Sequence, residues 1–502
     1  MTTSPNISRR QFLAGTGAGC MALAGAGFAQ PAPQPLPLLP LTDLATQPQE
    51  RLHLALQEGQ HNFGSGALSR TFGINQNHLG PVLRVRKGQT LPFDVSNGLD
   101  EVTTLHWHGL HIPGDVDGGP HQEVAPGQVW QPDVPITQRA SMNWFHAHTH
   151  GRTAQQTYRG LAGVMLVEDD DSLSADLPKT YGVDDLTLVL QDKSFDANGQ
   201  LHYALSEEVF EEGFLGETLV VNGVAGPTAR AVPQGWVRLR LLNASNARFL
   251  TVSLATGSVI VIASDGGFLA APVEVAEITL SPGERYEILV DMRLQTRNSL
   301  QVTYGGGEAA GLFEGLWTRL LGGAAAGPQT ALTLTQDPDL PAFTGTLPTR
   351  LAVLPPAEPE LAQRSRSFTL NMGGGEDLAV LAANWGNICG EAGGMGINGQ
   401  PMNMETINEQ VRLSDTEVWR INADEDLHPF HVHGCSFRIL QQNGTPPPAY
   451  AAGWKDMVHV EGGWSEILVK FDHPAPKEAP YMYHCHILEH EDCGMMGQFT
   501  VA

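Results

Sequence analysis

Positively charged residues are scarce in this chain. Its 502 residues include 29 Lys and Arg against 54 Asp and Glu, which gives a formal net charge of -25 at pH 7. Such an acidic surface repels nucleic acids and anionic membranes, and it attracts cations over a long range. The charge balance therefore argues against a nucleic-acid partner and favours cationic ones, although plain solubility explains it equally well.

Long apolar runs and long amphipathic helices are also missing. Beyond the first 30 positions no apolar run is long enough to span a bilayer, so we expect no membrane span. The length of the chain predicts about three domains. Short β-branched runs with period-two alternation, such as 81–86, 237–242 and 277–280, are separated by Gly, Pro and Asn turns. This pattern predicts an all-β fold built from β-sandwiches.

Two proline-rich segments interrupt this pattern. We interpret 31–40 and 338–359 as connectors, and the second as the boundary between the second and third domains. Three glycine clusters lack the Lys-Ser/Thr or strand-to-helix context of phosphate loops and are interpreted as ordinary loops.

The first 30 residues have the composition of an export signal. An Arg9-Arg10 pair precedes Phe12 and Leu13, and a run of small apolar residues follows as far as Phe28. This order is typical of a twin-arginine signal peptide with cleavage near residues 26 to 30. It predicts a bacterial, periplasmic protein; the alternative is an unstructured arm that happens to hold two arginines.

Cysteines are few. Of the five, Cys20 leaves with the signal, and the remaining four are too few for a disulfide scaffold in an oxidising compartment. Cys485 lies between two histidines and is better suited to bind a metal than to form a disulfide.

Histidines are absent from most of the middle third of the chain. They gather between 106 and 150 and between 428 and 490, and His202 is the only one between these two groups. A region nearly free of metal-ligand residues between two rich ones suggests a spacer domain that separates two parts of one site. Chance clustering is the alternative.

A repeated His-x-His pattern makes chance a poor explanation. Residues two apart on a strand face the same side, so each pair presents two imidazoles to one place. Eight such ligands exceed what one mononuclear site needs, and a cluster of several metal ions is implied. The pattern occurs at His106 and His108, His146 and His148, His431 and His433, and His484 and His486.

Cys485 indicates a second kind of metal site. Because it lies between His484 and His486 on an extended segment, its side chain points to the opposite face and serves a different metal. A thiolate, two histidines and a weak axial methionine are the ligands of a blue-copper electron-transfer site. His428, His490 and Met495 complete that set. Electrons taken up there have a covalent route through Cys485 to the histidines on either side.

These motifs closely resemble those of the multicopper oxidase family, in particular its bacterial periplasmic cuprous oxidases and laccase-like enzymes. The matching stretches are HWHGLHIPGDVDGGPHQ from 106, WFHAHTHG from 144, LHPFHVHG from 427 and HCHILEHEDCGMMGQFTV from 484. The resemblance implies three cupredoxin-like Greek-key β-sandwich domains, at 45–175, 176–340 and 341–502, after the signal at 1–30. It also implies a monomer that reduces O2 to water with single electrons from a reducing substrate.

The resemblance further implies four copper ions. Type 1 copper takes His428, Cys485, His490 and Met495; type 2 copper takes His106 and His431; the type 3 pair takes His108, His146 and His486 on one ion and His148, His433 and His484 on the other. Three further histidines match no ligand position and are expected beside the ligands or on the surface: His111, His121 and His150.

Two acidic residues fall on family positions where protons are needed. Reduction of O2 to two waters consumes protons as well as electrons, and Asp117 and Glu491 are placed to hold and relay them. A surface carboxylate is the alternative for each.

The electron donor is the open question. The methionine-rich insert of cuprous oxidases is short and Gly-rich here, around 370–404, and Asp424 and Asp426 stand where the family's extra cuprous site pairs an acid with a methionine. Carboxylates are hard ligands that suit Fe(II), Mn(II) or a phenol proton as well, and a solvated turn explains them too. We expect Cu(I) or another low-valent metal ion first, phenols and aromatic amines second, and Mn(II) last, with a role in copper tolerance.

Two further alternatives remain. Copper-free relatives in this family act as binding or scaffold proteins after losing copper ligands, whereas this chain keeps all twelve positions. Cys435 and Cys493 follow two of the copper motifs closely, so they are either joined by a disulfide or are two buried thiols.

Overall fold

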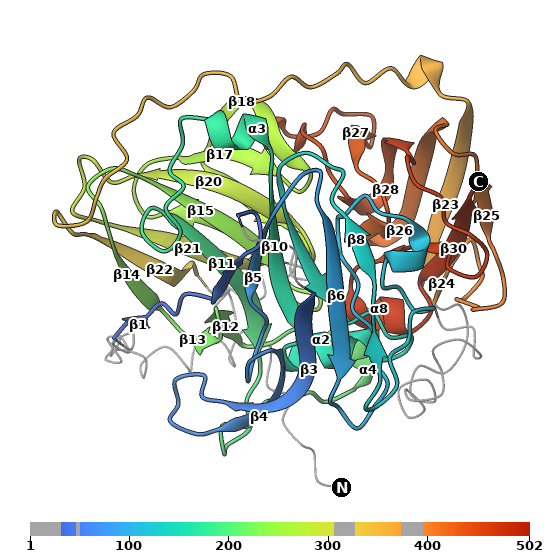
Figure 1. The fold of residues 1–502 in the computed structure, drawn as a ribbon, viewed down its shortest axis with the longest axis horizontal. Coiled ribbons are helices and arrows are strands. Elements are labelled where there is room, and N and C mark those ends of the chain that lie inside the picture. The colour runs from blue at the N-terminus through green and yellow to red at the C-terminus, as the bar shows by residue number, and fades with distance from the viewer. Residues whose placement is uncertain (1–31, 47–50, 306–326, 373–394) are drawn as a thin grey trace, which may run out of the picture. The chain divides into compact units, whose positions relative to one another are not determined.

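Strands dominate the structure, as the period-two pattern predicts. The computed structural model describes residues 32–46, 51–305, 327–372 and 395–502. Within these residues the strands form five sheets, and the helices are few and short (Figure 1). The all-β prediction is confirmed, and the three runs used to predict strands correspond to β5 (Val82–Arg86), β15 (Trp236–Asn243) and β19 (Glu277–Leu280).

Two sheets form the first sandwich, and they enclose a core that includes Phe93, Trp107 and Met165. One sheet has the order β2 (Leu41–Asp43), β5, β10 (Ala162–Glu168), β9 (Ser141–His146). The other contains β4 (Ser69–Ile74), β3 (Leu52–His61), β6 (Thr90–Asn97), β7 (Val129–Trp130) and β8 (Asp133–Pro135).

The second sandwich has the most uniformly aliphatic core, made of Leu, Val and Ile with Tyr286 and Met292. Its seven-stranded sheet has the order β13 (Val224–Ala225), β12 (Thr218–Val221), β11 (Asp185–Lys193), β15, β20 (Arg285–Asp291), β17 (Val259–Ser264), β18 (Gly267–Val275). Its six-stranded sheet has the order β1 (Gln34–Pro35), β14 (Thr228–Val232), β22 (Gln329–Gln336), β21 (Arg297–Gly305), β16 (Phe249–Leu254), β19.

The interpretation of 31–40 as a connector was wrong in part. Gln34–Pro35 forms β1 at the edge of the second sandwich, where proline is tolerated because an edge strand has N–H groups that need no partner. Leu36 and Leu39 are buried in two hydrophobic clusters, which anchors the segment. The second proline-rich segment forms no strand, as expected of a connector.

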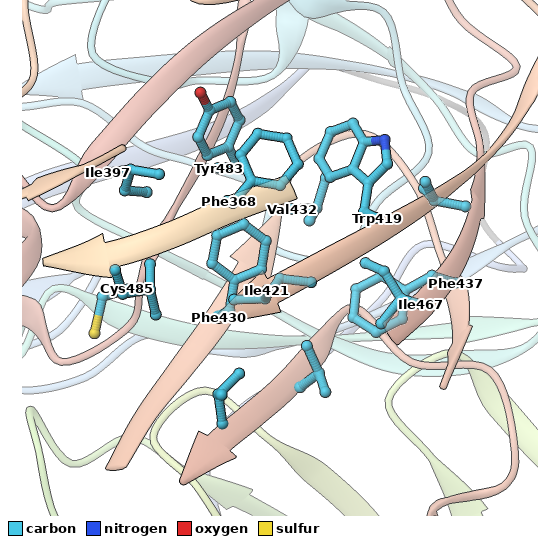
Figure 2. Packing of buried hydrophobic residues seen from close by; sticks show 14 of the residues in the cluster. Phe368, Ile397, Trp419, Ile421, Phe430, Val432, Phe437, Ile467, Tyr483 and Cys485 are labelled. Atoms are coloured by element: carbon cyan, nitrogen blue, oxygen red, sulfur yellow. The ribbon is translucent and has the colours of Figure 1, made fainter. Parts of the chain in front are cut away.

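The third sandwich is formed by one eight-stranded sheet that encloses an aromatic core, in which Phe368, Trp419, Phe430 and Tyr483 pack together (Figure 2). Cys485 lies at the edge of this core with its sulfur pointing away from the rings (Figure 2). The strands are β23 (Arg364–Asn371), β24 (Gly396–Ile397), β25 (Glu409–Val411), β26 (Thr416–Val432), β27 (Phe437–Gln442), β28 (Met457–Lys470), β29 (Tyr481–Cys485) and β30 (Met496–Val501).

Short helices lie in the connections. They are α2 (Thr153–Arg159), α3 (Asp170–Ser174), α4 (Glu207–Glu212) and α8 (Leu488–Asp492), with single 3-10 turns at Gly114–Val116, Pro359–Leu361 and Ala449–Ala451. Asp492 at the end of α8 accepts hydrogen bonds from the backbone N–H groups of Thr153 and Ala154, both at 2.9 Å. This carboxylate therefore ties the third sandwich to the first. No helix among the described residues is long and apolar enough to cross a membrane, and the signal predicted at 1–30 lies outside the described residues.

Buried charges join the three sandwiches. Arg285 of β20 donates to both carboxylate oxygens of Asp456, at 2.6 and 2.5 Å, and to the backbone oxygen of Met142 on β9 at 2.9 Å. Beside it, Lys455 donates to Glu284 at 2.5 Å and lies 2.9 Å from Asp265. These side chains are almost wholly shielded from solvent, so each charge depends on its partners. One guanidinium thus contacts all three sandwiches.

We expect Lys455→Met to destabilise the protein by about 3 kcal/mol, because it removes the cation that pairs with buried Glu284 and Asp265, and Asp265 then keeps Arg285 at 3.7 Å. The measurement is urea unfolding followed by intrinsic fluorescence. Arg86→Met is the matched control, since Arg86 pairs with Asp170, whose side chain is 91% exposed, and such a surface pair contributes less than about 1 kcal/mol. Equal losses of unfolding free energy in the two variants would show that the buried charges do not stabilise the contacts between the sandwiches.

Candidate metal centre

The four His-x-His pairs lie where the first and third sandwiches meet. His106 forms an isolated bridge with His146, and His431 pairs with His484 across β26 and β29. The residue between the two histidines of each pair faces the other way, into a hydrophobic core. These residues are Trp107 and Ala147 in the first sandwich and Val432 and Cys485 in the third. The structure therefore shows the strand alternation that the sequence predicts. All eight imidazoles face the seam, the place where the first and third sandwiches meet.

The eight imidazoles form three groups whose ligand atoms lie within 4.8 Å of one another. Two of the groups have the same members as the two type 3 sets inferred from the family resemblance. In the third, the predicted type 2 pair is joined by His433. The groups are His108, His146 and His486; His148, His433 and His484; and His106, His431 and His433.

Contacts of the Nδ1 atoms with backbone oxygens orient several of these rings. The Nδ1 atoms of His106, His431 and His484 lie 2.9–3.0 Å from the backbone oxygens of Asp117, Asp456 and Cys485. Such contacts fix the tautomer and direct the other nitrogen, Nε2, away from the backbone. Several of these inward nitrogens are buried and have no hydrogen-bond partner among the described residues: Nε2 of His106, His146, His431 and His486.

The nitrogens of one group converge on a single point. His148 Nε2 lies 3.1 Å from His433 Nε2 and 3.3 Å from His484 Nε2, which in turn are 3.3 Å apart. Burial lowers the pKa of His148 to about 3 and that of His433 well below its usual value, so both rings are neutral at pH 7. Imidazole nitrogens that lie 3.1–3.3 Å from one another around one point fit a metal cation, and imidazole suits copper.

Cys485 belongs to a separate group on the other side of β29. Its Sγ lies 3.5 Å from His428 Nδ1 and 3.6 Å from His490 Nδ1. Met495 is buried at the same place: its backbone N–H donates to His490 O at 2.9 Å, and its own carbonyl accepts from Cys485 N–H at 3.0 Å. Burial raises the pKa of the Cys485 thiol, so a thiolate here requires a cation beside it, as a bound copper would be. The donor set fits type 1 copper.

Both predicted proton-handling acids lie at the histidine cluster. Asp117 Oδ2 is 2.7 Å from His433 Nδ1 and 3.4 Å from His106 Nδ1. The carboxylate of Glu491 lies 3.3 Å from His148 Nδ1 and 3.1 Å from His484 Nδ1. Both carboxylates are buried, which excludes the alternative that they are surface residues.

A third buried carboxylate at the cluster was not predicted. Asp456 Oδ1 lies 3.2 Å from His108 Nε2, and the same side chain receives both hydrogen bonds from Arg285. Gly109 allows Arg285 and Asp456 to lie close to the backbone, because a Cβ on Gly109 would lie 2.7 Å from each of these side chains. The residue also has a φ of +87°, which favours glycine. The sequence holds no spacing signal for Asp456, since this residue, directly before β28, reaches the cluster through the tertiary fold.

The middle sandwich also covers the type 1 group. His490 Nε2 lies 3.0 Å from the backbone oxygen of Glu211, on α4. Four of the six residues of α4 are glutamate. The ring edge that points away from Cys485 is therefore covered by an acidic helix.

The other residues predicted from the sequence lie away from these ligand groups or have side chains outside the described part of the chain. His111 Nε2 contacts Ser436 Oγ and His121 Nε2 contacts Gln498 Oε1, each at 2.7 Å, and neither ring belongs to one of the ligand groups, nor does His150. Asp424 and Asp426 lie within β26, but their side chains are outside the described part of the chain.

The disulfide hypothesis was wrong. Cys435 and Cys493 are both buried and no disulfide joins them, which leaves the other alternative, two buried thiols. The Cys435 Sγ contacts the backbone oxygen of Val432 at 3.8 Å.

Comparison with family models and curated proteins gives two kinds of match. Three models described as multicopper oxidase match residues 55–172, 165–309 and 371–502. Among curated proteins, the chain is 38% identical over 501 residues to the cell division protein FtsP of Escherichia coli, and 37% identical to that of Xenorhabdus nematophila, with 99% of each chain covered.

Solved structures give the same family. The chain is 39% identical to CueO of a lignin-degrading Ochrobactrum species, a laccase-like multicopper oxidase with oxidase activity towards lignin model compounds and lignosulfonate, with a TM-score of 0.81 over 93% of this chain and 100% of that one. It is 30% identical to McoA of Aquifex aeolicus, with a TM-score of 0.78 over 94% and 99% of the two chains. These likenesses confirm the predicted cupredoxin-like fold.

Proposed function

The chain belongs to the multicopper oxidase family, and from that premise we propose that it is an oxidase that takes single electrons from a low-valent metal ion and reduces O2 to water. The convergence of the histidines at the seam, beside a separate Cys485 group, is the observation that carries this proposal. A scaffold has no need for unpartnered, buried imidazole nitrogens that face one another.

The proposal places four copper ions in these groups. His428, Cys485, His490 and Met495 hold the type 1 ion, His106 and His431 the type 2 ion, and two sets of three histidines the type 3 pair, as inferred from the family resemblance. Copper would supply one-electron redox chemistry at the first site and O2 reduction at the other three. Cys485 is covalently bonded to His484 and His486, so a single residue connects the two kinds of site.

Asp117 and Glu491 handle protons in this proposal. Each is buried against two histidines of the cluster, so each can hold a proton close to the place where O2 is reduced and can also orient those rings. Asp456 contacts His108 through the other ring nitrogen, Nε2, and is held in place by Arg285.

We expect Asp117→Asn and Glu491→Gln to lower the rate of O2 uptake by about tenfold to a hundredfold, while the blue absorption of the type 1 group is kept. The measurement is O2 uptake at saturating donor together with the visible spectrum. Glu489→Gln is the matched control: Glu489 is buried on the same helix, but its Oε1 accepts hydrogen bonds from Tyr203 and Asn246 instead of facing the cluster. An equal loss of O2 uptake in Glu489→Gln would show that Asp117 and Glu491 have no special role.

Helix α4, which covers the edge of the His490 ring, affects which electron donor can reach the type 1 group. An aromatic donor needs direct access to the His490 ring edge, whereas a metal cation is attracted by the overall negative charge of the chain. We therefore place Cu(I) or another low-valent metal ion such as Fe(II) first, phenols and aromatic amines second, and Mn(II) last. A role in copper tolerance follows if Cu(I) is the donor.

The test is O2 uptake by the copper-loaded protein with Cu(I), Fe(II), Mn(II) and a dimethoxyphenol, each with and without added Cu(II). We expect kcat/KM for the best metal ion to exceed that for the phenol by about tenfold or more. A phenol that is oxidised fastest without added Cu(II) would instead identify a laccase proper.

Export to the periplasm and the domain limits are parts of the same proposal. The twin-arginine sequence at 1–30 supports export. The limits 176–340 and 341–502 and the end of 45–175 are supported by the strands, because β2–β10, β11–β22 and β23–β30 form separate sandwiches, with β1 added to the second. The first sandwich begins before residue 45, since it includes β2 (Leu41–Asp43).

A role in cell division is the alternative that the names of the curated relatives suggest. It corresponds to a non-catalytic member of the family. The twelve ligand positions present in this chain favour the oxidase. A purified protein that binds no copper would favour the alternative.

A further inference from the structure

One buried cluster in the described structure consists only of methionines. Met402, Met482 and Met496 are each 2% exposed or less, and Met404 packs against them from a partly exposed position. The other hydrophobic clusters contain mainly Leu, Val, Ile, Ala and aromatic residues. Methionine is flexible and specifies packing poorly, so a cluster made of it alone is an unusual way to fill a core.

The strand register places this cluster beside the histidines. Across β29 and β30, His484 pairs with Met496 and Met482 pairs with Gln498. Directly opposite residues of an antiparallel pair share a face, as do residues two apart on one strand. Met482, Met496 and His484 therefore lie on the same face, while Cys485 points to the other. The thioethers adjoin the histidine cluster and not the Cys485 group.

The methionine cluster extends from the histidine cluster towards the surface. On the inner side, a Cβ on Gly119 would lie 3.6 Å from Asp117 Oδ2 and 3.9 Å from both Gln122 Oε1 and Met482 Cγ, so Gly119 lies between the carboxylate and the methionine cluster. On the outer side, Gln498 Nε2 donates to the backbone oxygen of Met404 at 2.9 Å, and partly buried His121 contacts the same amide.

We propose that Met402, Met404, Met482 and Met496 form a Cu(I)-binding site distinct from the four copper positions of the family. Thioether sulfur is a soft, neutral ligand that selects Cu(I) over Cu(II) and Zn(II), and it needs no deprotonation to bind. Four methionines supply enough sulfur for one such ion. The flexibility of their side chains lets the sulfurs adjust around it. Its place beside His484 and Asp117 suits a site that supplies Cu(I) to the histidine cluster.

The probe is Ag(I), which is as soft as Cu(I) but is not oxidised by O2. Copper-loaded full-length protein is titrated with Ag(I) in a calorimeter, and sulfur coordination is read from X-ray absorption at the silver edge. We expect one equivalent to bind through sulfur. Met402→Leu/Met482→Leu, which conserves volume, should weaken binding by about tenfold or more. Met404→Leu, at the partly exposed edge, should weaken it without disturbing the core.

Met142→Leu/Met165→Leu is the matched control, because both residues are buried in clusters of the first sandwich, away from the methionine cluster. It should bind Ag(I) as the wild type does. Unchanged affinity in the Met402/Met482 and Met404 variants would overturn the proposal. So would silver that is bound through nitrogen. Blue absorption and O2 uptake are followed in the same samples, so failure of the oxidase proposal is seen separately from failure of this one.

Discussion

We expect Cys485→Ser to abolish the blue absorption of the copper-loaded protein and to lower its O2 uptake to below about a thousandth of the wild-type rate, a loss of about 4 kcal/mol. Among the metal-binding groups formed by the described residues, Cys485 is the one cysteine, and its Sγ lies within 3.6 Å of two histidine nitrogens. The blue colour requires a thiolate bond to Cu(II), which serine cannot form. Visible absorption and an oxygen electrode measure the two effects.

Cys435→Ser is the control for this variant. Cys435 is as deeply buried as Cys485 and lies in the same sandwich, but it belongs to none of the metal-binding groups. We expect it to keep both the colour and the O2 uptake. A blue Cys485→Ser protein would refute the assignment of the type 1 site.

His146→Gln is expected to lower O2 uptake by a similar factor, about a thousandfold, while leaving the blue absorption intact. His146 is one of three histidines in a single ligand group, and its Nε2 is buried without a protein partner. It is not part of the Cys485 group. A donor should therefore still bleach the blue colour, and O2 should no longer restore it. Stopped-flow absorption under O2 follows both phases.

His111→Gln provides the comparison, because His111 comes from the same motif but contacts Ser436 and lies in no ligand group. It should reoxidise like the wild type. If His146→Gln reoxidises equally fast, the histidines at the seam do not carry O2 reduction.

The histidines that gather at the seam could be predicted because their signal is local. Each His-x-His pair is read from a few adjacent residues, and strand alternation fixes which side chains share a face. Trp107 and Cys485 illustrate this, since each is buried in a core while its flanking histidines face the seam. The all-β fold followed from the same alternation, and family resemblance added the division into sandwiches.

Contacts made through tertiary structure could not be predicted. Asp456, Arg285 and the Glu211 carbonyl reach the metal groups from strands or helices whose own sequence shows no metal motif. Their positions depend on how three sandwiches pack. The disulfide hypothesis failed for the same reason, because closeness of two motifs in space does not bring Cys435 and Cys493 together.

The number of methionines in one segment does not show how many methionines the fold brings together. The stretch around 370–404 is poor in methionine, which weakened the expectation of a cuprous enzyme. In the structure, Met402 and Met404 from that stretch meet Met482 and Met496 from β29 and β30. In the proposed site, the register of β29 and β30 places Met482 and Met496 on one face, and Met402 and Met404 join them from a connecting segment.

In the proposed function, the protein reduces O2 fully to water. The most direct test is the number of electrons consumed per O2 when a known amount of Fe(II) or Cu(I) is added to copper-loaded protein in a closed oxygen electrode, with catalase added at the end. We expect four electrons per O2 and no O2 returned by catalase. Two electrons per O2 with O2 returned, or no O2 uptake at all, would contradict it.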